Sequence, residues 1–462
     1  MNFVSKIFFV FFFVSFQVQA QGDKSSLVLD KGVKLVNIDK SFIEVQGRDV
    51  FFYEYKLNQL PQIEFSTEFP GTDCRLGKKI VCRSNAVVSF NEIEKNNSTL
   101  VLSYKKGRES IEFKFHRLPK NFPAMLIKGK SHLNQDFVFS WVPQKVDPQE
   151  MSEFSYLFIF SPEGKLKYFR YLPFIAIDFR PHVLGKRIYF SYLKSSAYYP
   201  FVTIEGKREL FDERMVFIKE FPELLDFHDF HLFDKDWYMG MTYTISQNKL
   251  GRKYLQQSIV EIKNGKKVFE WTIDDYMKLN PFPDWKLYSL FRGQTVVQQF
   301  HLNHIQVLGE YLLVSLGFES IVMLHKKTKK ISWVLGGGSD QFGAVGELGT
   351  TLHHTPNLDL KTSVLTVFDN GMNKQLSRII QYGLDLKNKK IKKFSLMNIP
   401  SVYASMMGSV NQQNNIYTIG FGTRDKGEVD ILEVENNKPN ISFYFKYPKS
   451  GIYQVYRATT IF

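Results

Sequence analysis

Hydrophobic and polar residues alternate in short runs along most of the chain, and one pattern recurs. It consists of two or three alternating apolar residues, a turn rich in Gly, Asn or Lys, and a second strand that often ends in Trp or Phe. The six copies are Leu157–Phe169, Val202–Phe211, Ile259–Trp271, Ile321–Trp333, Ile379–Phe394 and Ile431–Phe445. They begin at intervals of roughly 45 to 62 residues, and strand-and-turn repeats near this length are typical of β-propeller blades. The pattern predicts an all-β fold with a six-bladed β-propeller, which brings the same position of every blade to one central channel.

The segment before the repeats shows a different arrangement of short strands. Gly, Asn and Pro turns separate the expected strands, which are Val33–Val36, Val50–Tyr55, Val87–Phe90, Leu100–Tyr104, Ile111–Phe115, Ala124–Ile127 and Phe137–Trp141. This spacing predicts a β-sandwich-like domain over residues 21–145, with the propeller over residues 146–462 after the Pro-bearing stretch Val142–Glu150. Helical periodicity is confined to Asp274–Leu279, where a turn or two of helix is expected.

The first twenty residues have the pattern of a signal peptide. Lys6 supplies the positive charge, Ile7–Phe16 forms a ten-residue apolar core, and Val18–Ala20 ends in a small residue suited to cleavage. The apolar core is shorter than the about 20 residues that a transmembrane helix needs, although an uncleaved anchor is the alternative. We therefore expect a periplasmic or secreted protein without stable membrane insertion.

The charge balance bears on the class of ligand. Lys and Arg number 60 against 46 Asp and Glu, which gives a net charge of +14. Lysines are scattered through expected turns such as 326–330 and 387–390, where they form a solvated surface that protects strand edges. Export and this scattered placement argue against nucleic-acid binding. A small anionic substrate drawn into a positive channel fits the charge better.

The chain has two cysteines, Cys74 and Cys82. In an oxidising, exported compartment, a pair so close in sequence is expected to form a disulfide across a short hairpin. A redox or metal role is not expected, because the surrounding residues supply no further ligands.

Histidines gather at one position ahead of several repeats. Each upstream segment opens with an aromatic residue or a histidine and is followed by a loop and a strand. In the register that we infer, Arg180, His228, His301 and His354 occupy equivalent blade positions, where the innermost strand begins near the channel mouth. Because the fold would converge them, the set indicates a functional site.

Two kinds of chemistry suit a cluster of imidazoles. A zinc or copper site is one, but only Asp229 lies close in sequence to provide the acidic partners that ligating histidines usually have. We therefore expect no metal and no cofactor. The other is group transfer with one imidazole as nucleophile and the others as donors to the transferred anion, for which the uncharged amide of Asn303 is suited. His231 and His304 lie three residues beyond the shared position and are expected to point into the blade.

Ordered motifs from about residue 120 onward resemble those of the arylsulfotransferase family, exported bacterial enzymes that work without a nucleotide sulfate donor. The matching stretches are residues 156–169, 228–233, 301–305, 311–338, 353–355, 364–371, 377–385 and 456–458. The most specific of them reads VLTVFDNG, with His-Thr upstream and Ser-Arg downstream.

The resemblance implies a six-bladed propeller behind an N-terminal β-sandwich domain, and a ping-pong reaction without a cofactor. An aryl sulfate ester would give its sulfuryl group to a histidine, and a phenol would then accept it. His354 matches the family's nucleophile, His301 and Asn303 match its sulfate-binding pair, and His228 matches the remaining channel histidine. His228 is suited to protonate the leaving phenolate and to deprotonate the acceptor.

The sequence departs from the family pattern at Gly317, where family members usually carry an arginine. Its loss removes a charge-assisted contact to sulfate, and Arg180 is the candidate replacement from another blade. The departure leaves open a non-catalytic propeller that binds an anionic or aromatic ligand or a protein partner. A metal-dependent propeller enzyme is a third interpretation, and a homodimer through the N-terminal domain is also left open.

Overall fold

The chain divides into two compact units, Met1–Phe122 and Pro123–Phe462. The computed structural model describes residues 25–30, 33–38, 43–46, 49–53, 62–65, 73–76, 79–80, 87–89, 99–104, 109–118, 122–144, 154–195, 205–248, 251–278, 287–292, 294–298, 300–344, 346–399, 402–446 and 452–461. The predicted signal peptide over residues 1–20 lies outside these residues. So does Cys82, and with it the predicted disulfide to Cys74.

The first unit contains two β-sheets. The smaller sheet has the strand order β1-β2-β5-β8, and the larger has the order β3-β4-β10-β9-β6-β7. Their bounds are β1 Ser25–Asp30, β2 Val33–Ile38, β3 Ile43–Gln46, β4 Asp49–Tyr53, β5 Gln62–Phe65, β6 Asp73–Leu76, β7 Lys79–Ile80, β8 Val87–Ser89, β9 Thr99–Tyr104 and β10 Glu109–Leu118. In β10 the buried Phe113 and Phe115 alternate with the exposed Glu112 and Lys114, the period of two that buries one face of a strand.

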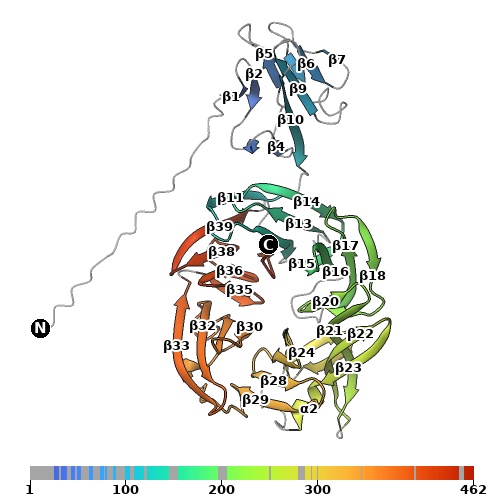
Figure 1. The fold of residues 1–462 in the computed structure, drawn as a ribbon, viewed down its shortest axis with the longest axis vertical. Coiled ribbons are helices and arrows are strands. Elements are labelled where there is room, and N and C mark those ends of the chain that lie inside the picture. Colours follow the sequence, from blue (N-terminus) through green and yellow to red (C-terminus); the bar gives the residue numbers. More distant parts are fainter. Residues whose placement is uncertain are drawn as a thin grey trace, which may run out of the picture. The chain divides into compact units, whose positions relative to one another are not determined.

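The second unit is a six-bladed β-propeller (Figure 1), which confirms the predicted fold. Blade 1 is β41 Thr459–Ile461, β12 Asp136–Gln144, β13 Ser155–Phe160 and β14 Leu166–Leu172; blade 2 is β15 Ile175–Leu184, β16 Arg187–Ser195, β17 Glu205–Phe211 and β18 Phe217–Glu220; blade 3 is β20 Phe230–Asp234, β21 Trp237–Gln247, β22 Lys253–Lys263 and β23 Lys266–Thr272. Blade 4 is β26 His304–Leu308, β27 Tyr311–Ser315, β28 Ile321–His325 and β29 Ile331–Leu335; blade 5 is β30 His353–Asp359, β31 Val364–Asp369, β32 Arg378–Asp385 and β33 Lys390–Asn398; blade 6 is β35 Ser409–Gln413, β36 Ile416–Gly420, β38 Ile431–Glu435 and β39 Lys438–Lys446. Within each blade the paired strands are antiparallel, and β15, β20, β30 and β35 lie toward the centre of the ring.

Several short strands and one short helix are added to the blades. The strands β24 Leu287–Phe291 and β25 Gln294–Gln298 extend blade 3, and β19 Leu225–Asp226 pairs with β17. The strands β34 Tyr403–Met406, β37 Thr423–Lys426 and β40 Ile452–Gln454 join the sheet of blade 1. The helix α2 (Ile273–Met277) confirms the helical turn expected near Asp274. No described helix combines the length and the apolar character needed to cross a membrane.

Both ends of the second unit close the ring. The strand β11 (Ala124–Gly129) pairs with β39 as the outer edge of blade 6, and β41 pairs with β12 in blade 1. Because β11 and β12 hydrogen-bond to propeller strands, the two units divide between Phe122 and Pro123 and not at residue 145. The strands were predicted at the right places, but short alternating strands carry no mark of the sheet that they join.

Apolar side chains fill the space between neighbouring blades. One buried cluster joins blades 3 and 4 through residues such as Trp271 and Leu312, and another joins blades 4 and 5 through residues such as Trp333 and Leu365. The middle strands β13 and β36 are buried along their whole length, since both faces of a blade are covered. This packing fixes the loops that carry the site.

One of the six predicted hairpins is wrong. The turn expected within Val202–Phe211 falls inside the single strand β17, whose hairpin partner is β18. Gly206 is not a turn residue: a Cβ there would lie 2.1 Å from the carbonyl oxygen of Lys194 on the paired strand β16. The glycine allows a close approach of two backbones. In the sequence, a glycine with this role cannot be distinguished from a glycine in a turn.

Candidate active site

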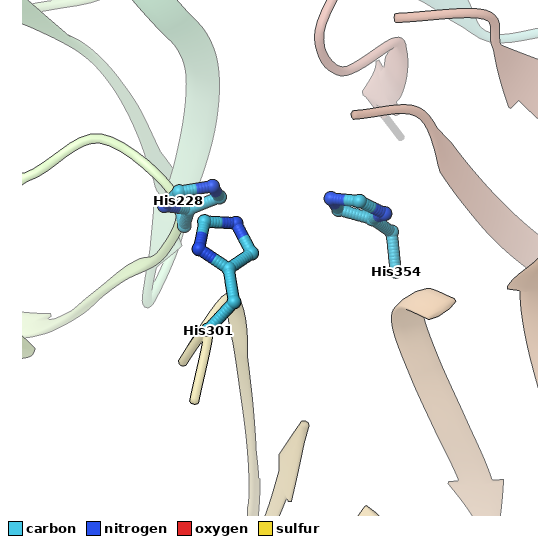
Figure 2. A group of neighbouring side chains, drawn as sticks. All are labelled: His228, His301 and His354. Atoms are coloured by element: carbon cyan, nitrogen blue, oxygen red, sulfur yellow. The ribbon is translucent and has the colours of Figure 1, made fainter. Parts of the chain in front are cut away.

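Three histidines from consecutive blades face one another in the second unit (Figure 2). His228 lies just before β20, His301 lies just before β26, and His354 is the second residue of β30. The ring centroids of His228 and His301 are 4.6 Å apart, and the ring of His354 lies 6.4 and 6.3 Å from them. One nitrogen from each ring lies within 4.8 Å of the others. These three residues are far apart in sequence but share one position in the inferred repeat register, and they lie together in the structure.

A hydrogen-bond network fixes the proton of His354. Its Nδ1 lies 3.0 Å from Oδ1 of Asn370, and the Nδ2 of that asparagine donates to the carbonyl oxygens of Ala404 at 2.6 Å and Met407 at 2.8 Å. Two carbonyl acceptors require the NH2 group on that side, so Oδ1 faces the imidazole and Nδ1 carries the proton. The Nε2 atom is left with its lone pair, buried and without a hydrogen-bond partner in the described part of the chain. A neutral imidazole with a free lone pair is a nucleophile.

His228 is held from its ring and from its backbone. Its Nδ1–H donates to Oδ1 of Asp226 at 2.8 Å, and the same oxygen accepts the backbone N–H of His228 at 2.7 Å. The other carboxylate oxygen accepts from the hydroxyl of Tyr243 at 2.6 Å. The carbonyl of His228 accepts from Tyr456 at 2.9 Å and from Nη2 of Arg457 at 2.7 Å. Its Nε2 is thereby the ring nitrogen left to exchange a proton in the pocket.

His301 is oriented by a side-chain amide. The Nε2 of Gln298 lies 2.9 Å from the Nδ1 of His301. With the amide donating to Nδ1, the ring proton sits on its own Nε2 and is a hydrogen-bond donor. With the amide turned over, its oxygen accepts from Nδ1–H and the lone pair moves to Nε2. His301 therefore has two states that differ by one amide rotation.

Burial keeps two of these rings neutral. The pKa values of His301 and His354 lie well below the usual value of 6.5. Desolvation by burial is the larger cause, and the neighbouring imidazoles are the second. Desolvation also lowers the pKa of His353, beside the site, to about 4. At neutral pH His301 and His354 are therefore uncharged, and the His354 lone pair is available.

Asn303 lies two residues after His301 and is fully buried. Its Nδ2 donates to the carbonyl of His353 at 2.8 Å, and its Oδ1 accepts from the hydroxyl of Ser315 at 2.5 Å. The amide links blade 4 to the strand that carries His354. Its observed contacts are those of a residue that positions the nucleophile.

Arg180 forms buried ion pairs next to the backbone of His228. Its Nη1 donates to Oδ1 of Asp229 at 2.6 Å and to the carbonyl of Phe230 at 2.9 Å, and its Nη2 lies 2.5 Å from Oδ2 of Asp178 and 3.4 Å from the His228 carbonyl oxygen. Both terminal nitrogens already have acceptors. The contacts of Arg180 are those of a buried ion pair beneath the site.

That ion pair belongs to a larger network behind the histidines. Arg208 lies 2.8 Å from Asp178, Arg457 lies 3.4 Å from Asp229, and the Nδ1 of His304 lies 2.6 Å from Asp229. Burial alone would raise the pKa of Asp229, but Arg457, His304 and Arg180 outweigh it and hold that pKa well below its usual range. The network joins blades 2, 3 and 4 to the C-terminal segment.

Gly317 packs directly against His301. Its φ is +55°, and a Cβ there would lie 2.8 Å from the carbonyl oxygen and 3.0 Å from the Cβ of His301. An arginine at this position would strain the backbone and push against the histidine. The loop is therefore built around glycine.

Sequence reasoning missed the residues that orient the imidazoles. Asp226, Gln298 and Asn370 each contact one ring, and Tyr456 and Arg457 hold the backbone of His228. A signal existed for two of them, because Asp226 and Gln298 lie two and three residues before their histidines. Asn370 lies 16 residues after His354, and only the strand pairing reveals its role.

A profile of the arylsulfotransferase (ASST) family matches residues 208–434. The matched region runs from β17 into β38 and contains all three histidines. Residues 208–434 form an arylsulfotransferase-family domain. Membership supports sulfuryl transfer as the general activity, and the recognised family resemblance is confirmed.

Other comparisons add little beyond the family. None of the curated proteins with which the chain was compared matches it. Among solved structures, it is similar to the C-terminal WD40 domain of Sif2, with 9% identity over 78% of this chain and 90% of that one and a TM-score of 0.33. It is also similar to the β-propeller domain of Cps50 (Swd1) from Myceliophteria thermophila, with 10% identity over 70% and 88% of the two chains and a TM-score of 0.34. For BamB from Moraxella catarrhalis the identity is 8% over 84% and 99%, with a TM-score of 0.30.

Proposed function

We propose that this arylsulfotransferase-family protein moves a sulfuryl group from an aryl sulfate ester to a phenol by a ping-pong reaction through a sulfohistidine at His354. The observation that carries the proposal is the buried, unpartnered Nε2 of His354, which Asn370 leaves with a lone pair. The other two imidazoles come from the two preceding blades and face it (Figure 2).

In the first half-reaction, Nε2 of His354 attacks the sulfur and the bond from sulfur to the aryl oxygen breaks. The phenolate leaves with a proton from Nε2 of His228, whose other nitrogen is held by Asp226. The ring of His354 becomes positive while it carries the sulfonate, and its Nδ1–H remains bonded to Asn370. In its Nε2–H state, His301 donates to a sulfuryl oxygen.

In the second half-reaction the steps reverse with a new phenol. Nε2 of His228 takes the hydroxyl proton, the phenolic oxygen attacks the sulfur, and the bond between sulfur and His354 breaks. Asp226 and Asn370 hold the Nδ1–H of their rings throughout, so only Nε2 atoms exchange groups. The neutral state of His354, which its lowered pKa maintains, is restored at the end.

We further propose that the chain acts outside the cytoplasm, in the periplasm or after secretion. The supporting observation is the signal-peptide pattern of residues 1–20, with Lys6 before an apolar core. Phenols and their sulfate esters are the proposed small-molecule partners.

One observation favours a second function, a propeller that binds an anionic or aromatic ligand without turnover. Gly317 occupies the position of the family's arginine, and its backbone leaves no room for a side chain toward His301. The terminal nitrogens of Arg180 have acceptors in the buried network. Sulfate would then be held without an arginine clamp, by the uncharged donors of the pocket.

The test is to incubate the full chain with an aryl sulfate in the absence of an acceptor and to measure its intact mass without acid. The proposal expects one added sulfuryl group, mapped to His354, which is released when phenol is added. His354→Gln should show neither label nor transfer while unfolding at the same temperature as the wild type. No label on folded wild-type protein, with saturable binding of the aryl sulfate, would favour the second function.

A further inference from the structure

The three channel histidines share one arrangement around their Nδ1 atoms. Each Nδ1 is within hydrogen-bond distance of one polar side chain: a carboxylate for His228, an amide oxygen for His354 and the Gln298 amide for His301. Ligating histidines in metalloproteins are oriented in this way, with one ring nitrogen held by a carboxylate or carbonyl and the other facing the ion. Of the described residues, these three also form the group whose donor atoms converge within 4.8 Å.

We propose that His228, His301 and His354 form a binding site for a divalent transition-metal ion, Zn²⁺ or Cu²⁺, and that the ion and the sulfuryl group compete for the Nε2 atom of His354. Three neutral imidazoles with an open fourth position form a ligand set that these ions prefer. The metal site goes beyond the proposed transfer reaction and does not depend on it, whereas the competition at His354 rests on the proposed function.

The geometry requires a small closure of the pocket. An ion about 2.0–2.1 Å from each nitrogen needs nitrogen separations of about 3.4 Å, so the widest pair has to approach by roughly 1.4 Å. His301 is the ring with room to move, because it is the half-buried member of the group. Its Gln298 amide must also turn, so that the oxygen accepts from Nδ1–H and Nε2 presents its lone pair.

Charge in the surroundings supports a cation at this position. The Asp226 carboxylate contacts His228 directly, and no arginine or lysine side chain contacts a ring nitrogen of the three histidines among the described residues. The guanidinium groups of Arg180 and Arg457 face the carboxylates of Asp178 and Asp229. The arginine of the family pattern, replaced by Gly317, would have opposed a cation.

The first measurement is titration of the full chain with Zn²⁺ alone by calorimetry, without any sulfate ester. The proposal expects one saturable site, with affinity at least 100-fold weaker in His301→Ala and in His354→Ala. His132→Ala is the matched control, because His132 is an exposed histidine paired with Glu435, and its affinity should equal that of the wild type. Equal affinity in the wild type and the two site variants would overturn the proposal.

A second measurement uses the wild-type protein alone, so its result cannot be caused by a variant that fails to fold. Diethyl pyrocarbonate modifies imidazole lone pairs, and mass spectrometry maps the sites. Saturating Zn²⁺ should protect His354 and His301 at least tenfold while leaving His132 unprotected. Equal modification with and without Zn²⁺ would contradict the site, whatever the transferase assay shows.

Gln298→Glu separates the metal site from the transfer reaction. A carboxylate can only accept from Nδ1–H of His301, which fixes the lone pair on Nε2. Zn²⁺ affinity should rise about 10-fold, in keeping with the effects of residues that contact metal ligands, while sulfuryl transfer should fall. If this variant loses both Zn²⁺ affinity and sulfuryl transfer at an unchanged unfolding temperature, Gln298 does not control the tautomer of His301.

Discussion

Partner side chains decide the chemistry of each imidazole in this site. Asn370 can face His354 only with its oxygen, because its NH2 group is occupied by the carbonyls of Ala404 and Met407. Gln298 has no such constraint among its observed contacts, so His301 can present either a proton or a lone pair. Residues of one type thus acquire different roles from the side chains that contact their Nδ1 atoms.

The Asp226 carboxylate should matter most when the leaving group is poor. Asp226→Asn keeps an acceptor for Nδ1–H of His228 but removes the negative charge beside the proposed proton donor. We expect transfer from phenyl sulfate to fall about 100-fold and transfer from 4-nitrophenyl sulfate to fall only a few-fold, because a nitrophenolate leaves without a proton. The measurement is kcat/KM for a series of aryl sulfates. Tyr243→Phe, which keeps the carboxylate, is the control, and an equal loss for all donors would mean that Asp226 has only a structural role.

Gly317 should resist replacement for two separable reasons. Gly317→Ala adds backbone strain of about 1–2 kcal/mol at φ +55° and a contact with His301. Gly309→Ala is the matched control, since its φ is +63° and a Cβ there meets no atom within 4 Å. We expect similar or larger destabilisation in Gly317→Ala, together with a loss of transfer that Gly309→Ala lacks, measured by urea unfolding and initial rates. Gly317→Arg should also lower activity; a gain would show that the loop can rebuild the family's clamp.

Among the elements, the repeat register was the strongest signal in the sequence. Six copies of one pattern, five of which are hairpins in the structure, predicted the six blades. The position ahead of the copies is where His228, His301 and His354 lie together. The same register gave Arg180 the equivalent blade position, and its guanidinium forms ion pairs with Asp178 and Asp229. A repeat register predicts where a residue lies along a strand. The direction of a long charged side chain depends on the opposite charges near it.

Contacts between elements could not be predicted in the same way. Arg457 binds the carbonyl of His228, 229 residues away in sequence, because the C-terminal segment returns to blade 1. The assignment of β11 and β12 to the propeller also depends on strand pairing, as in the ladder between β12 and β41. Periodicity in the sequence describes a strand and its exposed face, not its neighbour.

Arg457 should stabilise the junction between the C-terminal segment and blades 2 and 3. Arg457→Met leaves Asp178 and Asp229 with one positive partner fewer, and removing one member of a buried pair costs about 3–5 kcal/mol. The free energy of unfolding, measured in urea, should fall by that order. Adding Asp229→Asn should recover part of the loss, because the uncompensated charge is gone. Strictly additive losses in the double variant would show that Arg457 and Asp229 act independently.

At the scale of the whole molecule, buried histidines link the stability of the propeller to pH. Burial lowers the pKa of His182, His231, His301, His304, His353 and His354 below the usual 6.5. In the unfolded chain these side chains bind protons near pH 6.5, whereas in the folded chain they remain neutral to lower pH. Proton binding therefore favours the unfolded state as the pH falls.

We expect the free energy of unfolding of the propeller to be highest above pH 6.5 and to fall steadily between pH 6.5 and 5, where most carboxylates are still ionised. Each histidine that stays neutral when folded contributes a slope of up to about 1.4 kcal/mol per pH unit.

His353, with a pKa of about 4, should account for roughly 2 kcal/mol across this window. His353→Gln should therefore have a shallower slope in urea unfolding at pH 5, 5.5, 6 and 6.5, even if it is less stable throughout. An exposed-histidine variant, His132→Ala, should keep the wild-type slope. A wild-type stability that is constant over this range would mean that these imidazoles are already protonated in the folded propeller.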